Sequence, residues 1–340
     1  MRLPAPTALL IALPLALGAC GGDGDSEAAK TPFAVLEPPA TSSSPDSSAP
    51  AVEPGPDETE DPDPTTELVS LDWFGGDAAY PEVPSPVAER SVNAGLRAAI
   101  EDALQGREGD YSVIVHNLVD GRYAAINPDE TYYAASLFKA AVLLEVYRQR
   151  DAGLVDFAKE LTLDEESAEY DLGTLEYFEI EVGDRVTLGD AVKAMVIASD
   201  TALANLVLGE VGSGAVDATL SAIGATTMSV TTTALPTTAA DMTTLLLAIA
   251  RGDGVSEDSR REMLNLLGQE WFVSGVLAGI PAGTPYAHKT GSFTDATHDV
   301  AIVEGPAGPY LIAVLTDRSH EWEPIAEISA AVWQYFAANP

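Results

Sequence analysis

A serine and a lysine that stand three residues apart are the first candidates for chemistry in this sequence. They are Ser136 and Lys139, in the segment Ser136-Leu137-Phe138-Lys139. On a helix, residues at this spacing share one face, so the hydroxyl and the amine can meet. A lysine that loses its charge through burial can take the hydroxyl proton, which makes serine a nucleophile. The pair therefore predicts nucleophilic catalysis with Ser136 as nucleophile and Lys139 as base.

Two further polar motifs follow along the chain. They are Ser199-Asp200-Thr201, with Asn205 shortly after it, and Lys289-Thr290-Gly291-Ser292. The first lies at the junction of two helical stretches, and the second lies before two C-terminal strands. Each motif alone is also ordinary at a helix cap or a strand end. The chain has only five lysines, and two of them, Lys139 and Lys289, fall in the three motifs.

Together and in this order, the motifs resemble the Ser-x-x-Lys, Ser-Asp-Asn and Lys-Thr-Gly set of class A β-lactamases and penicillin-binding proteins. The resemblance implies that Ser136 forms an acyl-enzyme with a β-lactam or a related D-amino-acid amide or ester. Lys139 would activate Ser136, and Ser199 would relay a proton to the leaving nitrogen. Substrate-binding roles are implied for five residues, Thr201, Lys289, Thr290, Gly291 and Ser292.

The same resemblance gives these residues more specific tasks. Lys289 and Thr290 would hold the substrate carboxylate. The backbone N–H groups of Ser136 and Ser292 would form an oxyanion hole for the charge that develops on the attacked carbonyl. Gly291 would let the substrate approach the strand edge closely. Asn205 is interpreted as a structural residue near the site.

The sequence departs from the family pattern in two places. Thr201 stands where the family usually has asparagine, so a hydrogen-bonding group is kept but the donors of the amide are lost. Class A β-lactamases also carry a glutamate between the second and third motifs, which activates the water that clears the acyl-enzyme. Here no acid lies between Asp217 and Asp241. We therefore expect acylation to be faster than deacylation.

Two alternatives to a competent β-lactamase remain open. One is a penicillin-binding D-Ala peptidase or esterase with slow turnover. The other is a catalytically silent lipoprotein that binds cell-wall peptide. Intact Ser136, Lys139 and Ser199 argue against the silent protein, since a decayed site tends to lose one of them.

Histidines flank the third motif, and aromatic residues lie in a polar stretch after the first. His288 and His298 have no neighbours at metal-ligand spacing, so both are interpreted as structural. Asp299 is interpreted as a cap or as a strand-end partner of His298. Tyr170 and Tyr177 are interpreted as surface aromatics. The sequence predicts no metal and no cofactor.

The order of elements predicts an α+β fold of the β-lactamase/transpeptidase type, with an antiparallel sheet formed from N- and C-terminal strands and a mainly helical middle. Apolar spacing predicts a helix that starts near Pro86 and runs to Leu104. Strands are expected over 111–118, 122–126, 301–304 and 310–316, and helices over 135–150, in several stretches up to about residue 280, and over 324–336.

The N-terminal part predicts export and anchoring. A short apolar run that ends in Leu17-Gly18-Ala19-Cys20 has the layout of a secretory signal with a lipobox, and Cys20 is the only cysteine. We expect a lipoprotein signal peptide at 1–20, a disordered acidic tether rich in proline and serine at 21–84, and the hydrolase domain at 85–340. The lipid would hold the protein on the outer side of the bacterial cytoplasmic membrane.

The charge of the chain limits its partners. The formal net charge is −36, and residues 73–340 alone carry 40 acidic and 15 basic side chains, a net of −25. Such a surface excludes nucleic acid as a partner. The expected partners are a small-molecule or peptide substrate and, through the N-terminal lipid, the membrane. A monomer is expected.

Overall fold

The computed structural model describes residues 92–340. The predictions for the signal peptide, for Cys20 and for the tether concern residues outside this range. The first helix, α1 (Ala94–Leu104), begins later than the sequence predicts. Val92 is already outside the helix and 43% exposed, because the Asn93 side chain accepts a hydrogen bond from the Leu96 N–H and so caps the helix there.

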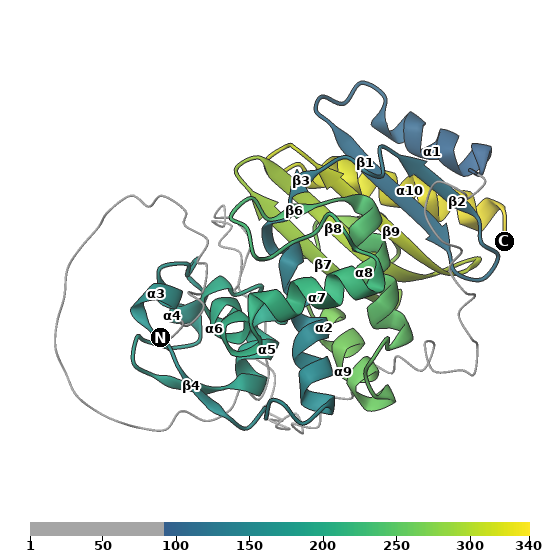
Figure 1. Cartoon of the computed structure of the whole chain (residues 1–340). Coiled ribbons are helices and arrows are strands. Elements are labelled where there is room, and N and C mark those ends of the chain that lie inside the picture. The colour runs from purple at the N-terminus through teal and green to yellow at the C-terminus, as the bar shows by residue number, and fades with distance from the viewer. Residues whose placement is uncertain (1–91) are drawn as a thin grey trace, which may run out of the picture.

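One five-stranded sheet joins the two ends of the described chain (Figure 1). Its strand order is β2-β1-β9-β8-β7, and every neighbouring pair is antiparallel. The strands are β1 (Tyr111–Asn117), β2 (Tyr123–Ile126), β7 (Tyr286–Phe293), β8 (Ala296–Gly305) and β9 (Gly308–Thr316). An early strand, β1, pairs along its whole length with the last strand, β9. The predicted α+β fold with a sheet from both ends is therefore confirmed.

Both faces of this sheet are covered, because alternate residues of β9 belong to two different buried clusters. Tyr310, Ile312 and Val314 belong to one buried cluster, and Leu311, Ala313 and Leu315 belong to the other. The first cluster lies under α1 and α10 (Trp322–Ala338), which pack against each other. The second lies under the helical middle of the chain. A strand buried on both faces has apolar residues throughout, so β9 is easily recognised in the sequence.

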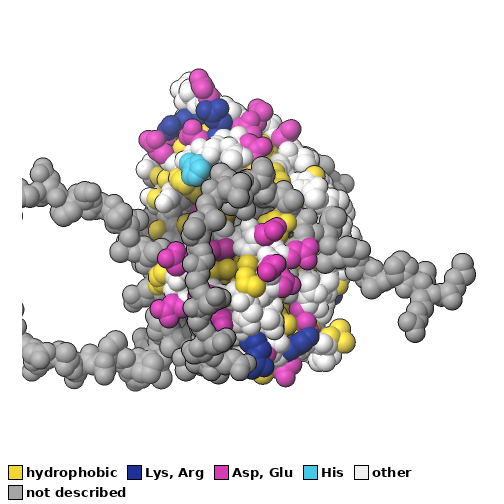
Figure 2. All heavy atoms as spheres, turned by 90° about the vertical axis from the view of Figure 1, so that its left-hand side faces the viewer, with side chains coloured by type: hydrophobic (Ala, Val, Ile, Leu, Met, Phe, Trp, Pro, Cys, Tyr) yellow, Lys and Arg dark blue, Asp and Glu magenta, His cyan; other side chains and the backbone are white. Residues whose placement is uncertain are grey.

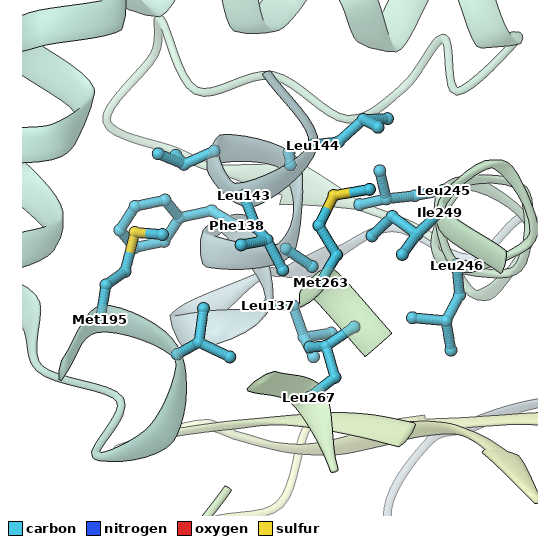
Figure 3. Close-up of a cluster of buried hydrophobic side chains, with 14 of the residues drawn as sticks. Leu137, Phe138, Leu143, Leu144, Met195, Leu245, Leu246, Ile249, Met263 and Leu267 are labelled. Atoms are coloured by element: carbon cyan, nitrogen blue, oxygen red, sulfur yellow. The ribbon is translucent and has the colours of Figure 1, made fainter. Parts of the chain in front are cut away.

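The helical middle is built around α2 (Phe138–Asp151). Ten consecutive residues of α2, 138–147, are buried, and its apolar side chains meet those of the neighbouring helices, including Met195 and Met263 (Figure 3). A helix buried on all sides has little amphipathic character. The neighbours are α5 (Leu188–Ile197), α6 (Thr201–Val211), α7 (Ser213–Ile223), α8 (Ala239–Arg251) and α9 (Glu257–Leu267).

Short elements complete the described structure. They are the 3-10 turns η3 (Ala135–Leu137) and η4 (Val276–Gly279), the helices α3 (Glu165–Ala168) and α4 (Thr174–Tyr177), and the paired strands β3 (Tyr132–Tyr133) with β6 (Pro236–Thr237) and β4 (Glu160–Thr162) with β5 (Arg185–Thr187).

Acidic side chains are scattered over the face of the helical region that Figure 2 shows. Within residues 92–340 no single helix has the length and hydropathy of a membrane span, and α6 and α7 meet that test only as a pair bent by 82°.

The third polar motif lies inside a strand that is not among the predicted strand ranges. Lys289-Thr290-Gly291-Ser292 belongs to β7, the edge strand next to β8, and it precedes the two C-terminal strands β8 and β9 as expected. The alternation of apolar and polar residues is missing here because the consecutive residues Lys289 and Thr290 both contact Glu270. This edge strand contacts η3, the turn that holds Ser136.

Candidate active site

The nucleophile and its predicted base lie in contact at the start of α2. Ser136 is in the middle of η3, and the helix continues as α2 from Phe138. Lys139 is fully buried, and its Nζ lies 2.9 Å from Ser136 Oγ. Ala135, just before the serine, has a φ of +45°, a strained conformation for a residue with a Cβ. The helical spacing thus brings the two groups together as predicted.

Ser199 joins the same cluster from the turn between α5 and α6. Its Oγ lies 3.3 Å from Lys139 Nζ and 3.1 Å from Lys289 Nζ, and its backbone carbonyl accepts a further hydrogen bond from Lys139. The turn needs a φ of +55° at Ser199. Asp200 holds it in place, because its carboxylate caps α6 at Leu203 N and accepts a hydrogen bond from Thr174 of α4.

Thr201, the first departure from the family pattern, turns its hydroxyl toward the lysine. Thr201 Oγ1 accepts a hydrogen bond from Lys139 Nζ at 3.0 Å. The shorter side chain therefore still contacts Lys139. Asn205 lies one turn further along α6, and its Nδ2 is buried without a hydrogen-bond partner among the described residues.

The environment of Lys139 favours its neutral form. Burial lowers its pKa from the ordinary 10.5 to about 7, and the nearby charge of Lys289 acts in the same direction. The carboxylates of Asp200 and Glu270 oppose this shift. A large share of the protein thus holds an uncharged amine beside Ser136 at neutral pH. An uncharged amine can accept the serine proton.

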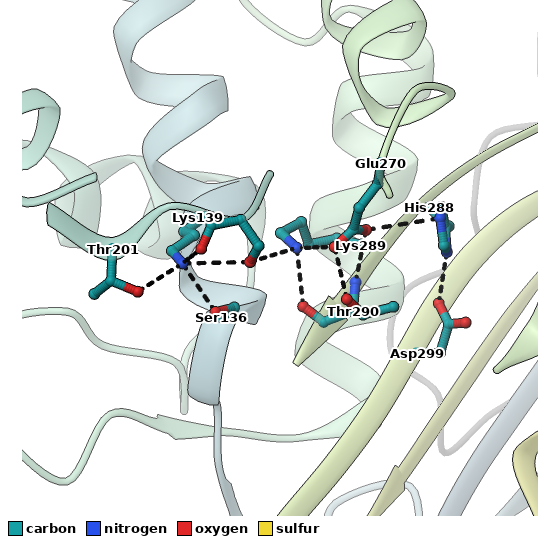
Figure 4. Close-up of polar contacts among 9 residues, drawn as sticks. Ser136, Lys139, Thr201, Glu270, His288, Lys289, Thr290 and Asp299 are labelled. Carbon is teal, nitrogen blue, oxygen red and sulfur yellow. Dashed lines mark hydrogen bonds and ion pairs between the residues drawn. The ribbon is translucent and has the colours of Figure 1, made fainter. Parts of the chain in front are cut away.

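Lys289 of the third motif contacts this cluster, and it also contacts the carboxylate of Glu270, a residue that the sequence did not predict at the site. Glu270 lies in the segment after α9, and Lys289 Nζ bonds both to Glu270 Oε1 and to Ser199 Oγ. Thr290 donates to the same carboxylate from its hydroxyl, at 2.6 Å, and from its backbone N–H, at 2.9 Å. Figure 4 shows these contacts as one connected series that starts at Ser136 and Thr201. Glu270 belongs to no motif, so no local signal marks it.

The histidine and aspartate beside the motif form a pair that differs from the prediction. Asp299 contacts His288, with 3.0 Å between Oδ1 and Nδ1, and its Oδ2 accepts from Val276 N. It is therefore not a partner of His298. Neighbouring residues of a strand point to opposite faces, and the β7–β8 register places Asp299 diagonally across from His288. Burial alone would lower the pKa of His288, but Asp299 and then Glu270 raise it.

His298 occupies the other face of β8 as a structural residue. Its Nε2 lies 2.8 Å from the carbonyl of Tyr133, and its Nδ1 accepts from Thr316 N. Burial lowers its pKa to about 4. A neutral imidazole that donates from Nε2 and accepts at Nδ1 fits both contacts. Both polar atoms of the ring are then satisfied by backbone groups.

Gly291 allows β7 to lie against the nucleophile turn. A Cβ on Gly291 would lie 2.9 Å from the Ala134 carbonyl oxygen and 3.3 Å from Leu137 N. The lack of a side chain is thus required by protein backbone, a packing role that the sequence interpretation did not include. Ser292, the next residue of the strand, is exposed.

The loop between α7 and α8, residues 224–238, lies next to the nucleophile turn, since Ala134 N donates to Leu235 O. The two acidic residues that flank this loop both accept hydrogen bonds from it. Asp217 accepts from Ser229 Oγ, Val230 N and Thr231 Oγ1, each at 2.7 Å. Asp241 accepts from Thr227 N and Met228 N. Both carboxylates are thus held by hydrogen bonds from the loop itself.

An aromatic cluster connects α4 with the segment after Glu270. Tyr177 makes edge contacts with Phe178 and Trp271, with ring centroids 5.3 Å and 5.2 Å apart. Tyr177 is 44% exposed, so it is a surface residue packed on two other rings. Among residues 92–340, no group of three or more His, Cys, Asp or Glu side chains has a geometry that suits a metal ion.

Comparison with known proteins identifies the family. Residues 95–336 match the profile described as the β-lactamase enzyme family. The chain belongs to the β-lactamase enzyme family. The family assignment agrees with the resemblance seen in the three motifs and with the sheet described above.

Solved structures support the fold of this family member. The structure of PBP-A is 22% identical, with a TM-score of 0.69, and the match covers 73% of this chain and 98% of that chain. A PBP-A mutant, titled as an acyl-enzyme complex with penicillin G, is 22% identical, with a TM-score of 0.67 and coverage of 72% and 96%. The class A β-lactamase of the last common ancestor of Gram-negative bacteria is 26% identical, with a TM-score of 0.64 and coverage of 72% and 100%. No curated protein matches the chain.

Proposed function

We propose that this β-lactamase family member is an acyl-serine hydrolase whose acyl-enzyme on Ser136 is long-lived. The observation that carries the proposal is the 2.9 Å contact between Ser136 Oγ and a buried Lys139 whose pKa is lowered to about 7. The pair has the distance that general-base activation of serine needs, and the lowered pKa leaves about half of the Lys139 amines uncharged at pH 7.

The reaction follows from the contacts around this pair. Neutral Lys139 takes the proton of Ser136 as Oγ attacks the substrate carbonyl. Ser199 Oγ, between the two lysines, passes a proton to the leaving group. The backbone N–H groups of Ser136 and Ser292 are proposed to stabilise the oxyanion, since β7 and η3 contact each other.

In residues 224–238, beside the nucleophile turn, no acidic side chain is present to act as the base for the second half of the reaction. Asp217 and Asp241 hold the neighbouring loop, and residues 224–238 contain no acid. A positioned general base contributes about 10²- to 10⁴-fold in rate. We therefore propose that deacylation limits turnover. The acyl-enzyme complex of a PBP-A mutant with penicillin G supports a β-lactam as the acylating probe.

A penicillin-binding peptidase or esterase is the second candidate function. It is favoured by the same absence of a free acid in residues 224–238, because slow release of a β-lactam is compatible with turnover of another acyl substrate. A silent binding protein would not be acylated at all.

The test is to incubate the protein with a fluorescent penicillin and a chromogenic cephalosporin and to follow labelling and hydrolysis together. The proposal predicts stoichiometric labelling and little turnover. Rapid, sustained hydrolysis would show a competent β-lactamase. No labelling would favour a silent protein and would reject the proposal.

We also propose that Cys20 carries a lipid that anchors the protein on the outer side of the cytoplasmic membrane. The support is the apolar run that ends in Leu17-Gly18-Ala19-Cys20.

A further inference from the structure

Glu270 lies where a substrate carboxylate would be expected to bind. In the family pattern, Lys289 and Thr290 are the residues that hold such a group. Here Glu270 Oε1 accepts hydrogen bonds from Lys289 Nζ and from Thr290 Oγ1. The side chains of Glu270 and Lys289 are completely buried, and Thr290 is 4% exposed (Figure 4). An internal carboxylate is thus bound to the expected anchor.

A count of donors shows how fully the anchor is occupied. A lysine ammonium has three N–H donors. Those of Lys289 are used by Glu270 Oε1, by Ser199 Oγ at 3.1 Å and by the Thr290 carbonyl at 3.0 Å. The single donor of the Thr290 hydroxyl is used by Glu270. A substrate carboxylate would therefore have to displace an existing partner from each group.

Displacement of Glu270 is opposed by its other contact. Glu270 Oε2 accepts the backbone N–H of Thr290 at 2.9 Å and lies 3.7 Å from His288 Nε2. If Glu270 moved away, a buried N–H would lose its partner. If Glu270 stayed, two carboxylates would share a site shielded from water, where like charges repel strongly.

We infer that Glu270 fills the carboxylate anchor, so that the site selects acyl esters or amides whose leaving group carries no free carboxylate. The Lys289–Glu270 pair keeps the pocket neutral and leaves Lys289 in contact with Ser199. This inference rests on the proposed acyl-serine function and names its substrate class.

The test compares a penicillin that has its free carboxylate with the methyl ester of the same penicillin. Second-order acylation rate constants are measured for the full chain and for Glu270→Gln. The wild type should be acylated by the ester at least as fast as by the acid. Glu270→Gln keeps the shape of the side chain and removes its charge, so the acid-to-ester ratio should rise tenfold or more.

Two controls make the ratio specific. A general change in the reactivity of Ser136 affects both probes equally and cancels in the ratio. Glu145→Gln replaces another buried glutamate, on α2, whose carboxylate bonds to Gln149 and Thr219. It should leave the acid-to-ester ratio at the wild-type value.

The outcomes separate this inference from the proposed function. A wild-type protein that prefers the acid by tenfold or more overturns the inference alone, and it does so even if Glu270→Gln fails to fold. An unchanged or lower ratio in folded Glu270→Gln also overturns it. If neither probe labels Ser136, the proposed acyl-serine function is wrong and the inference is lost with it.

Discussion

The rate at which a penicillin acylates Ser136 should depend on pH through Lys139. Only the neutral amine can accept the serine proton, and burial lowers the pKa of Lys139 to about 7. The neutral fraction is then about 9% at pH 6 and about 91% at pH 8. The acylation rate constant should accordingly rise about tenfold between these two values and level off above pH 8.

The size of the effect follows from the burial of Lys139. A change in its pKa from 10.5 to about 7 corresponds to about 5 kcal/mol in favour of the neutral amine. The side chain is fully buried, and the positive charge of Lys289 adds to the effect of burial. A lysine with the ordinary pKa would instead give about a hundredfold rise from pH 6 to pH 8, with no plateau below about pH 10.

The assay is fluorescent labelling by a penicillin at sub-saturating concentration from pH 5.5 to pH 9.5, with Ser136→Ala as the blank. Lys289→Gln supplies a second check, because removal of the neighbouring charge should move the inflection to higher pH. A profile that keeps rising tenfold per pH unit above pH 9, or one that is flat throughout, would refute the role given to Lys139.

Three further predictions concern other residues. Gly291→Ala should destabilise the fold by about 1–3 kcal/mol, because its Cβ would clash with the Ala134 carbonyl, and an unchanged unfolding temperature would argue against this packing role. Burial in the folded state lowers the pKa of His298 to about 4, so the unfolded state binds the proton more readily. Between pH 7 and pH 5, the unfolding free energy of the wild type should therefore fall by about 2 kcal/mol relative to that of His298→Gln, as measured by urea denaturation. Cys20→Ala should release the protein from the membrane fraction, and retention with normal signal cleavage would contradict lipidation.

Motif spacing was sufficient to predict the centre of the site. The Ser136–Lys139 contact follows from a local property, the spacing of neighbours on a helix. Ser199 and Lys289 were placed beside this pair by resemblance, and the structure brings both into contact with it. The sheet could be predicted because its most buried strands are strongly apolar.

What could not be predicted depends on tertiary contacts. Glu270 meets Lys289 only because α9 and β7 pack together, and the sequence around Glu270 contains no pattern that predicts this contact. The partner of Asp299 was misjudged because strand register, and not distance along the chain, decides which side chains meet. The range of β7 could not be predicted from the apolar pattern because polar residues of the site interrupt that pattern.

The most direct test of the central claim is mass spectrometry of the protein after reaction with penicillin G, followed by peptide mapping. The account predicts one adduct with the full mass of the drug, located on Ser136, and absent in a folded Ser136→Ala variant. It also predicts that the adduct persists long after excess drug is removed. An adduct on another residue, or continued labelling of Ser136→Ala, would contradict the account.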